Sequence, residues 1–405
     1  MNKITENLLL LFCKLIPLRK KVVFRSFNGH YSDSPKAISE ALHNARPDIR
    51  IIWLVNQERM NELPEYAEGV GINTAKSIFH LATTAAFIDN NYGRKGIVIT
   101  KDNNAVFAAR ILAWLNGRKG QVNLSTWHGT PLKKIGNDQY GSTGVDLITP
   151  PLLLVHPNVH TRDVMDRITF HRARHETLGL PRNDSLFYPE RRREIKRKLG
   201  IPEEKRVILY APTFRSDGYD TDNRNVERSG LAQIREIRFD DLFERLKNKF
   251  GGDDWVFIGR FHYFVEKEIN WDKLQQENPG RIMNGNAFDD MSDYLAAADV
   301  LLTDCSSCMF DYAFTERPVF LFFPDVKHYE GVERGFYFDM KELPFSCSTS
   351  FDDLLIQIDQ FEDVSYVENV KKLNGRLGAA DDGSAAKKVI ELMIKESGIL
   401  SERKG

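Results

Sequence analysis

Two short apolar runs, joined by a turn and a helix-like segment, constrain this chain most strongly. The first run, Val300–Leu302, ends in Thr303 and Asp304, and the second run, Val319–Phe323, follows Pro318. Between the runs, apolar side chains recur at helical spacing. The pattern predicts strand, tight turn, helix and strand, which is one βαβ unit of a parallel sheet.

The turn of this unit contains Ser306 and Ser307, at the start of the predicted helix. Free backbone N–H groups, the positive end of the helix dipole and two hydroxyl groups make such a turn suited to a phosphate or pyrophosphate. The alternative is that the serines only cap the helix. Spacing alone does not separate the two interpretations.

Apolar runs alternate with helix-like segments over most of the chain. Continuous apolar runs are typical of strands buried on both faces of a parallel sheet. Two such series predict two doubly wound α/β domains, whose ligands bind beyond the C-terminal ends of the strands. The predicted strands lie at 21–27, 49–55, 71–73, 86–90, 121–126 and 152–156, and then at 206–210, 255–259, 300–302 and 319–323.

Between the two series, at about 172–199, the sequence changes character, and we place the domain hinge there. The segment 191–198 contains six Lys and Arg residues and is predicted to be helical. Such a basic run is normally a solvated helix face. Attraction to anionic lipid headgroups is the alternative.

Composition excludes several classes of function. The formal net charge of the 405 residues is −1, which argues against bulk binding of nucleic acid. The chain has four cysteines, and Cys305 and Cys308 form a lone Cys-x-x-Cys, so zinc is not indicated and packing is favoured over a redox role. The absence of a disulfide framework fits the cytoplasm. No Gly-x-Gly-x-x-Gly occurs, so a nicotinamide cofactor is not supported.

The first 20 residues carry a membrane-binding pattern. No apolar run reaches the ~20 residues that span a bilayer. Apolar side chains including Leu8, Leu11 and Leu15 share one helical face, and Arg19, Lys20 and Lys21 follow. This predicts an amphipathic helix on an anionic membrane surface; the alternative is an ordinary packed helix. The segment 106–115, with Trp114 beside basic residues, is a second candidate of the same kind.

Two histidines follow predicted strands directly. His128 comes after the strand at 121–126, and His262 comes after the strand at 255–259, two residues beyond Arg260. A single histidine is usually structural. However, the C-terminal ends of strands in open α/β sheets are where ligand-binding groups collect. Both histidines are therefore candidates for a functional site.

Five motifs in order give the chain a resemblance to the CDP-glycerol glycerophosphotransferase family, the teichoic acid primases and polymerases. The segment Thr303–Tyr312 resembles the family signature Thr-Asp-Tyr-Ser-Ser-x-x-Phe-Asp, with Cys305 where the family usually has Tyr. The similarity runs from about 21 to about 375. The other four motifs are Thr126–Lys134, Leu178–Asp184, Tyr210–Arg215 and Arg334–Asp339.

The resemblance implies a GT-B-like α/β fold, with two facing Rossmann-like domains built on parallel sheets. We expect an amphipathic membrane-associating helix at 1–20 and an N-terminal acceptor domain at 21–185. A C-terminal domain at 186–375 would bind the CDP-alditol donor. A final helix at 376–405 would pack back toward the N-terminal domain.

The resemblance also implies a reaction and its residues. Glycerol phosphate would pass from CDP-glycerol to a hydroxyl, releasing CMP, with His128 as general base. His262 and Arg260 would stabilise the pyrophosphate or the leaving phosphate, and Asp311 would bond the glycerol hydroxyls unless it is a solvated helix residue. No metal ligand is assigned, no bound cofactor is expected, and a divalent-cation requirement is open. The expected donor-binding residues are Arg215, Arg260, Thr303, Ser306, Ser307 and Asp311, and possible phosphate or acceptor contacts are Gly129, Thr130, Lys133 and Lys134.

Other readings of the chain stay open at this point. The donor could be CDP-ribitol, or the protein could be a nucleotide-sugar glycosyltransferase of the same fold. A catalytically silent membrane scaffold is the alternative outside enzymes. The expected partners are an undecaprenyl-diphosphate-linked saccharide acceptor and the cytoplasmic face of the membrane, without nucleic acid. The chain length favours a primase weakly over a polymerase.

Overall fold

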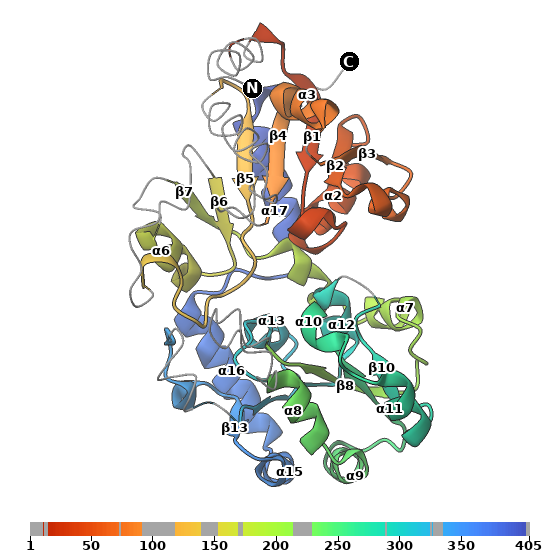
Figure 1. Ribbon diagram of the computed structural model, residues 1–405. Coiled ribbons are helices and arrows are strands. Elements are labelled where there is room, and N and C mark those ends of the chain that lie inside the picture. Colours follow the sequence, from red (N-terminus) through yellow and green to blue (C-terminus); the bar gives the residue numbers. More distant parts are fainter. Residues whose placement is uncertain are drawn as a thin grey trace, which may run out of the picture. The chain divides into compact units, whose positions relative to one another are not determined.

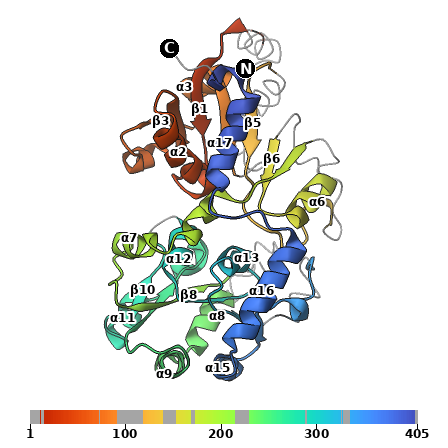
Figure 2. The same cartoon turned by 180° about the vertical axis from the view of Figure 1, so that it is seen from behind.

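The chain forms two compact units, each built on its own parallel sheet (Figures 1 and 2). Unit 1 comprises Met1–Thr130, Gly136–Asp184 and Leu377–Gly405, and unit 2 comprises Pro131–Ile135 and Ser185–Arg376. The structure is a computed structural model. It describes residues 11, 15–72, 74–90, 118–138, 153–168, 173–213, 229–287, 290–324, 326 and 335–401.

In its described part, unit 1 contains a seven-stranded parallel sheet in the order β3-β2-β1-β4-β5-β6-β7. The strand order reverses between β1 and β4, so the C-terminal ends of these two strands form the topological switch point. The strands are β1 (Arg19–Phe24), β2 (Arg50–Val55), β3 (Ala67–Gly71), β4 (Thr84–Asp89), β5 (Val122–Ser125), β6 (Leu153–His156) and β7 (Arg174–Thr177).

One face of this sheet is covered by α2 (Asp33–Ala45) together with α17 (Ala385–Glu396), which comes from the end of the chain (Figure 2). Buried Leu42 of α2 and Met393 of α17 join the same hydrophobic cluster as Phe24 and Trp53 of the strands. The other described helices of unit 1 are α3 (Ala75–Thr83), α6 (Val159–Ile168) and the short α18 (Gly398–Ser401).

The start of α17 is held by the segment that ends the first part of unit 1. The Asp184 carboxylate accepts hydrogen bonds from the backbone N–H groups of Ala385 and Ala386, both at 2.9 Å. The Asp381 carboxylate accepts from the backbone N–H of Leu180 and from the Asn183 amide. The two Asp184 bonds satisfy N–H groups that the start of α17 leaves without intrahelical partners.

Unit 2 contains a six-stranded parallel sheet in its described part, in the order β10-β9-β8-β11-β12-β13. Its order reverses between β8 and β11, which places the switch point there. The strands are β8 (Arg206–Ala211), β9 (Trp255–Gly259), β10 (Ile282–Asn284), β11 (Val300–Thr303), β12 (Val319–Phe322) and β13 (Ser346–Ser348). The helices are α7 (Arg191–Lys198), α8 (Ser229–Glu236), α9 (Phe239–Phe250), α10 (Tyr263–Glu266), α11 (Trp271–Glu277), α12 (Met291–Ala297), α13 (Cys308–Ala313), α15 (Phe351–Asp359) and α16 (Asp363–Leu377).

The predicted βαβ unit is confirmed as β11, α13 and β12. One predicted strand differs from the structure: the strand expected at 71–73 is β3, which ends at Gly71. The helix at 363–377 was not predicted. Helix α2 begins at Asp33, with Ser32 before it, and Ser34 lies fully buried inside its first turn.

The basic helix at 191–198 is confirmed, but it is not solvated all round. Lys196 is 6% exposed, and its ammonium group donates hydrogen bonds to the carbonyl oxygens of Glu203 and Lys205. Most of the predicted N-terminal helix (1–10 and 12–14) lies outside the described residues. So do the predicted helix at 106–115 and Arg215.

Candidate functional site

His128 lies in a sharp turn just past the end of β5. Trp127 before it has a φ of 53°, and Gly129 after it has a φ of 132°, a conformation that favours glycine. The His128 Nδ1 atom lies 3.2 Å from the backbone carbonyl oxygen of Asn90, at the end of the neighbouring strand β4. Because a carbonyl oxygen can only accept, Nδ1 carries the hydrogen. In the neutral ring Nε2 therefore holds the lone pair that can accept a proton.

The surroundings of His128 favour its neutral form. Its ring packs against Trp127, with ring centres 4.0 Å apart, and against Phe27 at 5.7 Å. Burial lowers the pKa of His128 below its usual 6.5 and outweighs the opposing effect of the Asn90 carbonyl. A neutral imidazole with an available Nε2 has the form that a general base needs.

An ion pair holds the backbone of the His128 turn. Arg182 Nη1 donates to Asp33 Oδ2 at 2.7 Å, and Arg182 Nη2 donates to the carbonyl oxygen of His128 at 3.0 Å. Burial by itself would raise the pKa of Asp33, but the Arg182 charge and hydrogen bonds lower it overall. The sequence predictions named neither residue as functional, although Arg182 lies in one of the five motifs.

The residues that follow His128 in sequence divide between the two units. Thr130 is 1% exposed and its hydroxyl accepts a hydrogen bond from the Asn158 amide at 2.7 Å, which suits a structural role. Lys133 and Lys134 belong to unit 2, where Lys133 forms a β-bridge with Phe336 and the Lys134 N–H donates to the carbonyl oxygen of Gly335. Unit 1 thus holds His128 and Gly129, but not the lysines.

At the switch point between β8 and β11 in unit 2, two side chains of the Thr-Asp-Cys-Ser-Ser motif hydrogen-bond the backbone at the end of β8 and just beyond it. The Thr303 hydroxyl donates to the carbonyl oxygen of Ala211 at 2.7 Å. The fully buried Asp304 carboxylate accepts from the Thr213 N–H, at 2.9 and 3.0 Å. Asp304 was not among the predicted site residues. Thr303 was among those residues, and its hydroxyl holds β11 to β8.

Ser306 and Ser307 lie between β11 and α13, at the same C-terminal edge of the sheet. Ser307 occupies the N-cap position, but its side chain makes no capping hydrogen bond. Ser306 Oγ accepts from the Cys308 N–H at 3.5 Å, the outer limit of a hydrogen bond. Both serines are partly exposed. Capping therefore does not account for Ser307.

Three residues in and just after this turn are buried, namely Cys305, Cys308 and Asp311. Asp311 is 3% exposed, so the alternative that it is a solvated helix residue is wrong. Cys305 and Cys308 are buried free thiols, and burial raises the pKa of Cys308 to about 11. A thiol with so high a pKa is not a reactive thiolate, which agrees with a packing role for Cys308.

Arg260 and His262 follow β9 at the same C-terminal edge of the unit 2 sheet. The Arg260 guanidinium donates to the Gly285 carbonyl oxygen at 2.7 Å and lies 5.0 Å from the centre of the Tyr294 ring. His262 is exposed, although partial burial of its ring lowers its pKa. Between them, the backbone of Phe261 exchanges two hydrogen bonds with the Asn286 amide. Asn286 therefore fixes the path of the chain into His262; no sequence pattern had indicated it.

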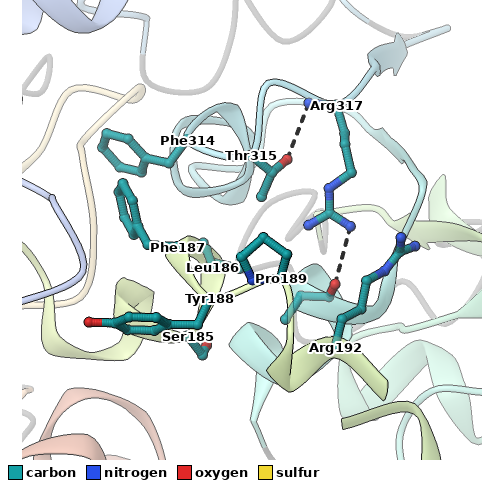
Figure 3. A pocket seen from close by; sticks show the side chains of 10 residues that line it. Ser185, Leu186, Phe187, Tyr188, Pro189, Arg192, Phe314, Thr315 and Arg317 are labelled. Atoms are coloured by element: carbon teal, nitrogen blue, oxygen red, sulfur yellow. Dashed lines mark hydrogen bonds between the residues drawn. The ribbon is translucent and has the colours of Figure 1, made fainter. Parts of the chain in front are cut away.

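A pocket of about 370 Å³ lies at the opposite edge of the unit 2 sheet (Figure 3). Arg317, in its lining, precedes β12 by two residues. Arg192 bonds the carbonyl oxygen of Ala297 and pairs with Asp299, whose carboxylate accepts from the N–H of Val207 at the start of β8. The pocket therefore adjoins the N-terminal ends of the strands, away from the serine turn.

Comparison with known proteins identifies the family. The model of the CDP-Glycerol:Poly(glycerophosphate) glycerophosphotransferase family matches residues 9–395 of this chain. The chain belongs to this family. The resemblance seen in the five motifs is thereby confirmed.

Members of the family with curated names support the assignment. A teichoic acid poly(glycerol phosphate) polymerase of Staphylococcus epidermidis is 30% identical over 398 residues, 93% of this chain and 51% of its own length. A teichoic acid glycerol-phosphate transferase of Staphylococcus aureus is 29% identical over 403 residues and covers 94% of both chains. The chain spans about half the length of the S. epidermidis polymerase and of a Bacillus subtilis polymerase that it matches.

A solved structure confirms the fold class. The wall teichoic acid polymerase TagF, in a histidine-to-asparagine variant soaked with CDPG, is 27% identical and superposes with a TM-score of 0.75, covering 98% of this chain and 94% of that chain. The predicted α/β, GT-B-like class with two parallel sheets is therefore confirmed. The roles of the individual site residues stay predictions.

Proposed function

We propose that this chain transfers glycerol phosphate from CDP-glycerol to a hydroxyl of a teichoic acid chain or of its lipid-linked saccharide precursor, and releases CMP. The observation that carries the proposal is His128, a neutral histidine at a strand end whose Nδ1 bonds a carbonyl oxygen and whose Nε2 is available. Family membership and the names of the relatives support the choice of donor.

In the proposed reaction, His128 Nε2 takes the proton of the acceptor hydroxyl. The hydroxyl oxygen forms a bond to the phosphorus that carries glycerol, and the bond from that phosphorus to the bridging oxygen of CMP breaks. CMP leaves with the electron pair. Removal of the proton as the new bond forms makes the neutral hydroxyl a competent nucleophile. The Arg182–Asp33 pair holds the backbone of the base in place.

Unit 2 would hold the donor. His262, Arg260 and the Ser306–Ser307 turn supply positive charge and hydrogen-bond donors at one sheet edge, which suits the pyrophosphate and the charge that develops on the leaving CMP. Lys133 and Lys134 belong to the same unit and would add to that charge. Asp311 is the proposed partner of the glycerol hydroxyls, and Arg215 remains a proposed phosphate ligand.

Incubation of the protein with CDP-glycerol, CDP-ribitol or UDP-sugars tests the proposal. We expect CMP release from CDP-glycerol in the presence of a lipid-linked acceptor, and little release from the other donors. Preference for CDP-ribitol would identify a different alditol, and UDP release would identify a glycosyltransferase. No turnover of any donor would support the scaffold alternative.

We expect replacement of Ser306 and Ser307 by alanine to weaken CDP-glycerol affinity roughly tenfold, because a hydrogen bond to a charged group contributes about 1.5–3 kcal/mol. The backbone N–H groups of the turn stay, so binding is reduced and not abolished. Calorimetric titration measures the change. Ser350→Ala is the matched control, because Ser350 caps α15 by accepting from the Asp353 N–H and should affect stability alone. An unchanged affinity in the double variant would show that the serines do not serve the donor.

We also propose that the N-terminal segment binds the cytoplasmic face of the membrane. Leu11 and Leu15 are 56% and 74% exposed, and Arg19 lies against the half-exposed Phe79 ring. Among the described residues, no helix is long and apolar enough to cross a bilayer. Exposed leucines followed by basic residues suit an anionic lipid surface.

Deletion of residues 1–15 should release the protein from anionic vesicles in sedimentation assays while turnover of a soluble acceptor analogue continues. The deletion keeps Ile16, whose carbonyl accepts a hydrogen bond from Arg118, and it keeps β1. The variant Leu11→Ser/Leu15→Ser should also sediment less with anionic vesicles than the complete chain, but the decrease should be smaller than for the deletion. Equal sedimentation of the deleted and complete chains would remove the proposal.

A further inference from the structure

Arg25 is a buried arginine whose guanidinium makes no hydrogen bond in the described part of the chain. Only 7% of the residue is exposed, yet the structure records no hydrogen bond or ion pair for its side chain among the described residues.

The position of Arg25 points to a ligand. Arg25 directly follows β1, and Asp89 ends β4, so both lie at the topological switch point of unit 1, where open α/β sheets bind their ligands. Side chains alternate along a strand, which puts Arg25 on the same face as Val23 and Phe87. Asp89 lies on that face and raises the pKa of Arg25 against the stronger, lowering effect of burial.

The two residues that follow Arg25 connect it to His128. Phe27, two residues beyond Arg25, contacts the His128 ring. Ser26 accepts a hydrogen bond from the Asn90 amide, and the carbonyl of Asn90 holds His128 Nδ1. A ligand that reaches the proposed base can therefore also reach the edge occupied by Arg25.

We propose that Arg25 binds a phosphate group of the acceptor, next to the hydroxyl that reacts at His128. A buried cation without hydrogen bonds is costly, and an anion that supplies these bonds lowers that cost. The planar guanidinium matches two oxygens of a phosphate diester. The inference rests on the proposed function, because it assumes that His128 is the base.

The proposal deepens that function by specifying the acceptor. In a chain that ends in glycerol phosphate, one three-carbon unit separates the terminal hydroxyl from the nearest phosphate. A saccharide hydroxyl has no phosphate at that spacing. Arg25 therefore favours an acceptor that already ends in glycerol phosphate over an unmodified saccharide.

The test compares Arg25→Gln with Arg162→Gln, an exposed arginine of the same unit that pairs only with its neighbour Asp163 among the described residues. For Arg25→Gln we expect the KM for an acceptor ending in glycerol phosphate to rise roughly tenfold to hundredfold, since charge-assisted hydrogen bonds are lost. The KM for a saccharide acceptor and the Kd for CDP-glycerol should not change. Arg25→Lys should raise the acceptor KM less than Arg25→Gln does, because lysine keeps the positive charge but lacks the planar guanidinium that can donate two parallel hydrogen bonds.

A second measurement does not depend on catalysis. Glycerol 3-phosphate should raise the thermal unfolding midpoint of the parent protein and of Arg162→Gln, but not of Arg25→Gln. The unfolding midpoint without ligand does not separate a binding role from a structural role, because Arg25→Gln also leaves the buried Asp89 carboxylate without its nearby cation.

Two results would overturn the proposal: equal stabilisation of Arg25→Gln by glycerol 3-phosphate, or an acceptor KM that does not change in Arg25→Gln. The second would assign Arg25 to a structural pair with Asp89. If the parent protein releases no CMP from CDP-glycerol but is stabilised by glycerol 3-phosphate through Arg25, the proposed function fails and the phosphate site stands.

Discussion

His128→Ala is expected to lower acceptor-dependent CMP release by about 10²–10⁴, the usual contribution of a general base, while CDP-glycerol still binds. His128 belongs to unit 1, whereas the serine turn, Arg260 and His262 belong to unit 2, so the variant leaves the proposed donor residues intact. Rate assays with acceptor, beside calorimetric titration of the donor, separate the two effects. His43→Ala, which removes a histidine stacked on Tyr66 in the same unit, is the matched control.

The pH dependence gives this prediction a second readout. The base acts when His128 is neutral, so the rate should fall as the pH drops through its pKa, which burial holds below 6.5. Above that pKa the rate should no longer change with the ionisation of His128. The residual activity of His128→Ala should lack this acidic limb. Retention of more than about a tenth of the parent rate would make the base assignment wrong and favour His262 instead.

His262→Ala is expected to reduce both turnover and donor binding, in contrast to His128→Ala. Loss of one preorganised donor at a developing charge typically costs about 10²–10³ in rate, and the same contact holds the bound pyrophosphate. His262 is exposed at the edge where β9 ends, and Asn286 fixes the backbone leading to it.

Two further variants sharpen this prediction. His262→Gln keeps a hydrogen-bond donor and should recover part of the donor affinity. Asn286→Ala should lower turnover to a smaller degree, because it loosens the backbone of Phe261 without removing a proposed ligand group. Donor titration and steady-state rates measure both. If His262→Ala binds CDP-glycerol as tightly as the parent protein, His262 is not on the donor side.

The local pattern of the chain was enough to predict the class of fold. Strand and helix periodicity depend on residues two to four positions apart, so β8, β9 and the β11–α13–β12 unit could be predicted from their own residues. For the same reason, the position of His128 just past a strand was visible in the sequence. The order of motifs then indicated the family, which the family model confirmed.

The contacts that build the site depend on the order of strands in the sheets, which no local pattern contains. Arg182 meets Asp33 across 149 residues, and Thr213 meets Asp304 across 91. Lys134 follows His128 closely in sequence, yet the chain passes into unit 2 between them. The sequence determined which side chains are available and which strand ends carry them; the tertiary structure decided which of them meet, because that depends on packing between segments far apart in the chain.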